Sequence, residues 1–288
     1  MTMKTGDRVT DRISRLVDRG LDRLRHGLEE RTARKYDQSP LCHAPLAEPA
    51  EYRRLWEDAQ RQSYPAIDRY EAQCGAAIDP AWFHQLALLT QVVIKQSEIC
   101  YQHGRLLYAA LVSYARGRAH DHLTIVETGT ARGFSALCLA KALDDTGATG
   151  KIVSFDVLPH DSRILWNCIR DAEGARTRAE LLDDYRGLME RYTMFHQGDT
   201  RMALARMSVP RVHFAFLDSV HSYDHVMAEF SSIRDRQTAG DILFFDDYTP
   251  DAYPGVVKAA DEICLAHGYA RTIVSATERR RYLIAEKR

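Results

Sequence analysis

The sequence predicts an α/β protein with a mostly parallel sheet of seven strands, covered by helices on both faces and preceded by an α-helical N-terminal region. Two observations lead to this class. After residue 120, short apolar runs alternate with helical segments, as in a parallel sheet that is buried on both faces. Before residue 119, the apolar residues instead follow helical spacing. We therefore expect a helical region over residues 1–118 and a second domain over residues 119–288.

The first helical segment of the N-terminal region is amphipathic. From Val9 to Leu28 apolar residues recur every three or four positions, while acidic and basic residues interleave on the other face. This mixture favours a solvated surface over a lipid-binding one. We expect the helical region to cover a pocket or to mediate oligomerisation, as a homodimer or higher homo-oligomer. Helical patterns resume from Tyr52 to Cys74 and again at Asp79, an expected N-cap followed by Pro80 at the first helical position.

The second part of the chain alternates between strands and helices. Strands are expected at Leu123–Val126, Lys151–Phe155, Tyr192–His196, Val212–Leu217, Asp241–Phe245, Ala270–Ser275 and Arg280–Ala285. Helices are expected over Gly133–Leu143 and Gly255–His267, and the polar connection 158–190 is expected to be mostly helical. This order is that of a Rossmann-like fold, with the last two strands closing the sheet.

The composition is that of an ordinary globular protein. The 288 residues are 45% hydrophobic and 27% charged with a formal net charge of -1, which argues against a dedicated nucleic-acid partner. The six cysteines form no C-x-x-C pair, so we expect buried free thiols and no structural zinc site. The sequence has neither an apolar signal core near its N-terminus nor an apolar run long enough to span a bilayer. We therefore expect a cytoplasmic protein with no membrane partner.

Acidic residues stand at or just beyond the ends of the first five predicted strands. They are Glu127, Asp156, Asp199, Asp218 and the pair Asp246 and Asp247. Ligands of open α/β sheets bind outside the carboxyl ends of the strands. Two bare charges about 4 Å apart repel by ~4 kcal/mol at an effective dielectric constant near 20. A row of carboxylates at this edge therefore indicates a cationic or hydroxyl-bearing ligand.

The turn after the first strand, Glu127-Thr-Gly-Thr-Ala-Arg-Gly-Phe-Ser135, indicates a nucleoside-type cofactor. Gly129 and Gly133 allow the backbone to approach a ligand closely, although a generic tight turn would also use them. The turn lacks the G-x-G-x-x-G spacing of dinucleotide enzymes and the lysine of a P-loop, so a ligand without a pyrophosphate fits better. Asp156 ends the next strand, where a carboxylate can accept from both ribose hydroxyls.

A second acidic cluster combines Asp218-Ser-Val-His221-Ser-Tyr223 with Asp246-Asp247. If the fourth and fifth strands are neighbours, three carboxylates converge, and oxygen ligands suit Mg²⁺ or another divalent cation. His221 lies three residues beyond Asp218 and can act as a base near neutral pH. Taken alone, Asp246-Asp247 would favour helix or turn capping, and His221 alone would favour a surface or capping histidine.

These residues resemble a class I S-adenosylmethionine-dependent methyltransferase over about residues 120–286. Three stretches are similar to the metal-dependent O-methyltransferases of natural-product biosynthesis, typified by the macrocin and mycinamicin sugar methyltransferases. The stretches are Glu127–Ser135, Leu217–Val226 and Gly240–Tyr248, the last followed by Tyr253-Pro-Gly-Val256. The last two together are fairly specific, whereas the glycine motif is common to the whole class.

The resemblance implies methyl transfer from S-adenosyl-L-methionine to a hydroxyl of a small-molecule acceptor, with Mg²⁺ as a second cofactor. The implied cofactor-binding residues are Glu127, Thr128, Gly129, Thr130, Gly133, Ser135, Asp156, Asp199 and Asp218. Of these, Glu127, Gly129 and Ser135 would line the methionine end, Asp156 would bind the ribose and Asp199 would lie near the adenine. Asp218, Asp246 and Asp247 would hold Mg²⁺, and His221 would act with Asp218 in catalysis as the general base. Ala131 and Val220 depart from the pattern of many relatives, and Val220 leaves His221 as the only obvious base.

Two other functions remain open from the sequence. A metal-independent methyltransferase acting on nitrogen or carbon would need His221 but no cation, and a non-catalytic protein would bind the cofactor alone. Trp166, Tyr248 and Tyr253 are candidates to line an acceptor pocket. The run Arg279-Arg-Arg281 is interpreted as a solvated strand surface that prevents edge pairing.

Overall fold

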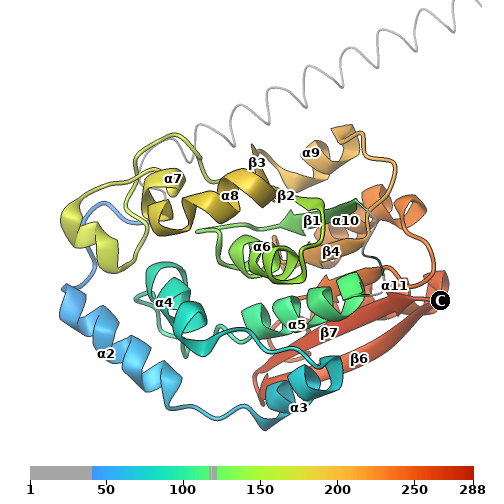
Figure 1. Cartoon of the computed structure of the whole chain (residues 1–288), viewed down its shortest axis with the longest axis horizontal. Coiled ribbons are helices and arrows are strands. Elements are labelled where there is room, and N and C mark those ends of the chain that lie inside the picture. The colour runs from blue at the N-terminus through green and yellow to red at the C-terminus, as the bar shows by residue number, and fades with distance from the viewer. Residues whose placement is uncertain (1–40, 117, 119–121) are drawn as a thin grey trace, which may run out of the picture.

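The computed structural model describes residues 41–116, 118 and 122–288, so the amphipathic segment from Val9 to Leu28 lies outside the described residues. The described chain folds around a seven-stranded sheet, which confirms the predicted α/β class (Figure 1). The strands lie in the order β3-β2-β1-β4-β5-β7-β6. The first five of these are parallel, while β7 and β6 run antiparallel at one side of the sheet.

All seven predicted strands are present, and each end lies within two residues of its predicted position. They are β1 (Leu123–Thr128), β2 (Gly150–Asp156), β3 (Thr193–Gln197), β4 (Phe214–Leu217), β5 (Ile242–Phe245), β6 (Tyr269–Thr277) and β7 (Arg280–Lys287). The central strands are apolar throughout because both of their faces are covered. In β4, for example, Phe214 and Phe216 belong to one hydrophobic cluster, and Ala215 and Leu217 belong to the other.

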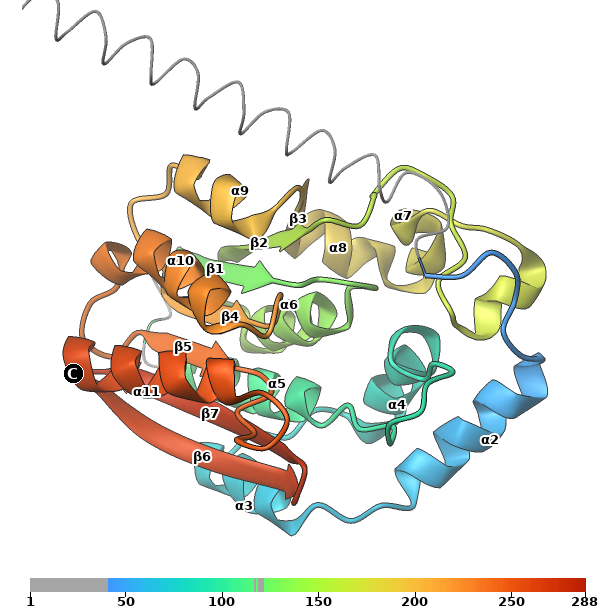
Figure 2. The same cartoon turned by 180° about the vertical axis from the view of Figure 1, so that it is seen from behind.

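Helices cover both faces of the sheet. One face carries α3 (Pro65–Cys74), α5 (His103–Arg116), α6 (Phe134–Thr146) and α8 (Arg186–Tyr192), which are nearest the viewer in Figure 1. The other face carries α9 (Thr200–Arg206), α10 (Tyr223–Ile233) and α11 (Pro254–His267), which come to the front in Figure 2. Two more helices, α2 (Pro49–Gln60) and α4 (Pro80–Thr90), flank one end, and the connection 158–190 contains the short α7 (Arg178–Leu181) with two 3₁₀ turns.

Proline sets the starts of the early helices. The pattern predicted from Tyr52 to Cys74 lies in two helices, because Pro65 lacks an amide hydrogen and favours the first turn of a new helix. The cap predicted at Asp79 is confirmed, since its carboxylate accepts from the amide of Trp82 at 2.7 Å and Pro80 follows it.

The helices that precede the sheet share its core. Leu106 and Leu111 of α5 are fully buried in the same cluster as Phe214 of β4 and Phe244 of β5. The side chains that cover this face of the sheet therefore come from both parts of the sequence. In the part of the chain that the structure describes, no helix is long and apolar enough to cross a membrane.

The parallel strands bring their carboxyl ends to one edge. Sheet growth reverses between β1 and β4, since β2 and β3 follow on one side of β1 while β4 and β5 lie on the other. This reversal leaves a crevice at the strand ends, which is the usual ligand position in such sheets.

Candidate active site

A cavity of about 430 Å³ opens at the reversal point. Its lining residues are Gly129, Asp156, Val157, Asp199, Thr200, Arg201, Ser219, Val220, Ser222 and His225. Three of the predicted cofactor residues, Gly129, Asp156 and Asp199, therefore share one cavity although they lie at the ends of three different strands. A larger cavity, of about 550 Å³, is lined by residues such as Gly75 and Gly147. It borders the C-terminal end of α6, away from the carboxyl ends of the strands.

Gly129 brings the turn after β1 against the backbone that follows β4. Its φ of +82° lies in the left-handed region, and a Cβ there would stand 1.9 Å from the carbonyl oxygen of Asp218. A larger residue would therefore be strained and would also clash with backbone. This close approach places the cofactor turn beside the second acidic cluster.

Asp156 and Asp199 both line the cavity, and each also accepts hydrogen bonds from backbone amides of the neighbouring loops or helix. One oxygen of Asp156 accepts from the amide of Ala131 at 2.6 Å, and the other accepts from the amide of Leu158 at 2.7 Å. Ala131 has a φ of +44°, so the first of these bonds holds an unfavourable backbone conformation in place. Asp199 caps α9 and pairs with the guanidinium of Arg201 at 2.7 Å, and this pairing lowers the pKa of Asp199. Carboxylate oxygens with two lone pairs keep capacity for further donors.

The other predicted loop residues support the turn rather than line the cavity. Glu127 is fully buried, and its carboxylate accepts from the hydroxyls of Ser135, Ser154 at 2.5 Å and Thr130 at 3.2 Å. Burial raises the pKa of Glu127, and the three hydroxyl donors oppose this effect. Gly133 forms the N-cap of α6 with a φ of +90°. The structure therefore brings Glu127 and Ser135 together beneath the turn.

Two of the three carboxylates predicted for the second cluster, Asp218 and Asp247, lie together with His221. Strands β4 and β5 are neighbours, and Leu217 pairs with Phe245. In the described chain, Asp218, His221 and Asp247 each place a ligand atom within 4.8 Å of the others. His221 Nε2 lies 3.2 Å from Asp218 Oδ1 and 3.3 Å from Asp247 Oδ2. The cluster thus contains one imidazole held between two carboxylates.

Asp246 lies outside this group and pairs with an arginine. Arg280 Nη2 is 2.8 Å from Asp246 Oδ2, and Arg280 Nη1 is 3.3 Å from Asp247 Oδ1. Although burial opposes the ionisation of Asp246, Arg280 lowers the pKa of this carboxyl. The interpretation of Arg279–Arg281 as a solvated surface is therefore wrong for Arg280, whose side chain is 24% exposed and faces the acidic cluster.

Burial and mutual repulsion disfavour the charged forms of two carboxyl groups in the cluster, Asp218 and Asp247. Burial, reinforced by Asp246, raises the pKa of Asp218 well above its usual range and that of Asp247 to about 6. Burial opposes the charging of His221, but the hydrogen bond to Asp218 and the negative charges of Asp218, Asp247 and Asp246 together outweigh it and raise the pKa of the imidazole. A divalent cation would relieve this repulsion, and carboxylate oxygens are the ligands that Mg²⁺ prefers. The residues present therefore fit a cation site.

Of the three aromatic candidates, one lies beside the cluster. The ring of Tyr253 is 4.6 Å from that of His221, between ring centroids. Trp166 is buried and donates from Nε1 to the carbonyl of Arg176 at 2.7 Å. Tyr248 is also buried, and its hydroxyl donates to Asp261. Only Tyr253 is therefore placed to meet a molecule bound at the cluster.

Besides cavity-lining residues such as Thr200 and His225, the residues that the sequence did not point to include Arg280 and Glu229. Glu229 is 1% exposed on α10 and accepts hydrogen bonds at the strand ends from hydroxyls that include Thr128. Its position is three residues after Val226 and four before Ile233, so it stands on the apolar face of an amphipathic helix. A glutamate among the apolar residues of this helix face was the signal in the sequence that could have pointed to a buried functional carboxylate.

Comparison with known proteins agrees with this architecture. Residues 126–248 match a family model described as a methyltransferase domain. The matched segment contains every predicted site residue from Glu127 to Asp247 but not Arg280.

Solved structures share the fold of this chain. A cofactor-bound protein from MTB, Rv0187, has 17% sequence identity and a TM-score of 0.52, covering 80% of this chain and 99% of that one. The O-methyltransferase NovP has 16% identity and a TM-score of 0.50, covering 68% of this chain and 84% of that one. At these identities the likeness is one of fold, a Rossmann-like methyltransferase fold. The search of curated proteins found no match.

Proposed function

We propose that the protein is an S-adenosylmethionine-dependent methyltransferase that acts on a hydroxyl group of a small-molecule acceptor with the help of Mg²⁺ or another divalent cation. One observation carries this proposal: a single turn serves both sites. Ser219, Val220 and Ser222 line the cavity, while Asp218 and His221 of the same turn belong to the acidic cluster. Ligands bound at the two sites would lie side by side. The match of residues 126–248 to a methyltransferase domain supports the assignment.

The cavity offers acceptors for a nucleoside that carries a positive charge. Asp156 would accept from the ribose hydroxyls, and Asp199 would lie toward the adenine. Gly129 would let the backbone approach the methionine part, and the hydrogen bonds between Glu127 and Ser135 would keep the turn in shape. When bound, the sulfonium cofactor supplies a methyl group to a nucleophile aligned with its carbon–sulfur bond.

The acidic cluster would prepare the acceptor hydroxyl. Asp218 and Asp247 would hold the cation, and Asp246, which pairs with Arg280 here, is the third proposed ligand. A bound divalent cation lowers the pKa of a coordinated hydroxyl and orients it. His221 would accept the proton of that hydroxyl as general base. Tyr253, whose ring is tilted by 50° against that of His221, would form one wall for the acceptor.

Binding measurements test the two ligand sites without knowledge of the acceptor. Isothermal titration calorimetry should detect S-adenosylhomocysteine, and electron paramagnetic resonance should detect Mn²⁺ as a probe of the cation site. Asp218→Asn should weaken Mn²⁺ binding by at least about tenfold, because one charged ligand is lost. Asp224→Asn, at an exposed position on the first turn of α10, is the matched control and should bind as the wild type does.

Turnover tests the chemistry. Transfer of labelled methyl groups to a panel of hydroxyl-bearing small molecules should require a divalent cation and stop in EDTA. Full turnover in EDTA would refute the role of the cation and favour the metal-independent alternative. Failure of the wild-type protein to bind S-adenosylhomocysteine would refute the cofactor assignment itself.

A further inference from the structure

A buried glutamate lies behind the wall of the cavity. Glu229 is 1% exposed and accepts from three hydroxyls that come from three separate elements. Thr128 at the end of β1 donates to Oε2 at 3.2 Å, Thr200 at the start of α9 donates to Oε1 at 2.5 Å, and Ser219 after β4 also donates to Oε1. The carboxylate therefore joins the ends of two strands and one helix at the reversal point.

Two of these hydroxyls, those of Thr128 and Thr200, also contact residues of the proposed ligand sites. The hydroxyl of Thr128 accepts from the amide of Asp218 at 3.3 Å, so one chain leads from Glu229 to the backbone of a proposed cation ligand. The hydroxyl of Thr200 lies 2.8 Å from Nε2 of His225, and Thr200, His225 and Ser219 all line the cavity. The same carboxylate therefore orients groups that face the cofactor and groups that face the cation.

We propose that Glu229 is a positioning residue that sets the hydrogen-bond direction of the cavity wall, so that the cofactor binds more tightly when Glu229 is ionised. This inference rests on the proposed function. An ionised carboxylate accepts from all three hydroxyls at once, so Thr200 and Ser219 direct their hydrogens inward and present lone pairs to the cavity. A protonated carboxyl must donate one hydrogen itself, which forces one hydroxyl to turn. The amino group and hydroxyls of a nucleoside are donors, so they match a wall of acceptors.

The surroundings allow this group to change charge under ordinary conditions. Burial raises the pKa of Glu229 to about 7, while the three hydroxyls oppose the effect. On α9 the charged neighbours are Asp199, which disfavours ionisation, and Arg201. On α10 the titratable neighbour is His225, whose Nε2 is 3.6 Å from Glu229 Oε1. From β1 and from the residues after β4, the facing groups are the uncharged hydroxyls of Thr128 and Ser219.

Titration calorimetry of the full chain with S-adenosylhomocysteine between pH 6 and pH 8.5 tests the inference. The wild-type affinity should rise by about fivefold with increasing pH, the value of one well-formed hydrogen bond, and level off above pH 8. Protons should be released on binding near pH 7, which is measured by repeating the titration in buffers of different ionisation enthalpy. Glu229→Gln keeps the shape but never ionises, so its affinity should stay near the low-pH wild-type value throughout.

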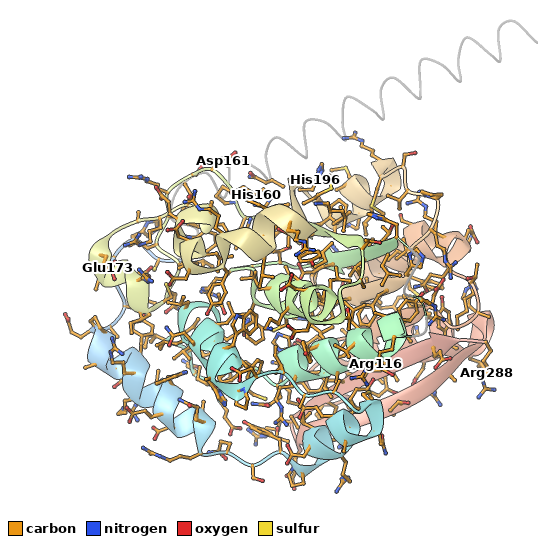
Figure 3. All side chains as sticks on the ribbon, viewed as in Figure 1. Arg116, His160, Asp161, Glu173, His196 and Arg288 are labelled. Atoms are coloured by element: carbon orange, nitrogen blue, oxygen red, sulfur yellow. The ribbon has the colours of Figure 1, made fainter. Side chains whose placement is uncertain are left out.

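The control variant is Glu173→Gln, at an exposed glutamate that Figure 3 shows at the far end of the molecule from Arg288. It should reproduce the pH profile of the wild-type protein. An unchanged profile in Glu229→Gln would overturn the inference. So would a wild-type affinity that is flat from pH 6 to pH 8.5 without proton release, a result that does not depend on whether the variant folds. Absence of binding at every pH would overturn the proposed function together with this inference.

Discussion

Replacing Gly129 with alanine adds one methyl group at the contact between β1 and β4. That methyl would stand 1.9 Å from the carbonyl oxygen of Asp218 and 2.6 Å from its carbonyl carbon, so one backbone segment must move by about 1 Å to restore ordinary contact. Forcing extra volume into packed structure costs roughly 1–3 kcal/mol. Holding alanine at a φ of +82° adds about 1–2 kcal/mol. We expect the variant to lose about 2–5 kcal/mol of unfolding free energy.

Urea unfolding measures this loss, and Gly147→Ala is the matched control. Gly147 also has a positive φ, +66°, but a Cβ there meets nothing within 4 Å, so only the backbone cost applies. The displacement should also move Asp218 within the acidic cluster, so Gly129→Ala should weaken binding of both S-adenosylhomocysteine and Mn²⁺. If Gly129→Ala loses no more stability than Gly147→Ala, the close approach of the two strand ends is not as described.

Two further predictions concern the buried charges. Because the pKa of Glu229 is raised from 4.5 to about 7, the folded wild-type protein holds a proton that the unfolded chain releases, and its stability falls as pH rises through this interval. Relative to the wild type, Glu229→Gln should gain up to about 3 kcal/mol between pH 4.5 and pH 8 in urea unfolding, and a constant difference would contradict the raised pKa. Arg280→Met should destabilise by about 3–5 kcal/mol, because it leaves Asp246 buried at 1% exposure without its cation. Equal effects of Arg280→Met and of Arg279→Met, at an exposed neighbour, would show that the ion pair contributes nothing.

The strands were predictable because a sheet buried on both faces needs continuous apolar runs. Phe214–Leu217 and Ile242–Phe245 contain no polar residue, and an acidic residue directly follows each run. Parallel neighbours then bring those acidic residues to one edge, so local sequence and one topological rule were enough to anticipate the convergence of Asp218 and Asp247.

The pairing of Asp246 with Arg280 could not be predicted in this way. The two residues are separated by 34 positions and meet because β7 returns antiparallel beside β5. The sequence also does not show which of the adjacent residues Asp246 and Asp247 contacts His221 and which contacts Arg280. Asp247 adopts a φ of +52° and turns its carboxylate toward His221, while that of Asp246 stays with Arg280. Similarly, the burial of Glu229 depends on how α10 packs against the strand ends. Helical periodicity alone does not specify this packing.

The antiparallel pair β6–β7 has a consequence for how the protein can be divided. A fragment limited to residues 126–248 would end just after β5, leaving that strand with an open row of amide and carbonyl groups. The fragment would also lack α5, so the apolar face of the sheet that this helix covers would be exposed to water. It would lack Arg280 as well, whose guanidinium neutralises Asp246. The segment 126–248 that matches the family model is therefore too short to fold by itself. Expression of this isolated segment should yield insoluble material.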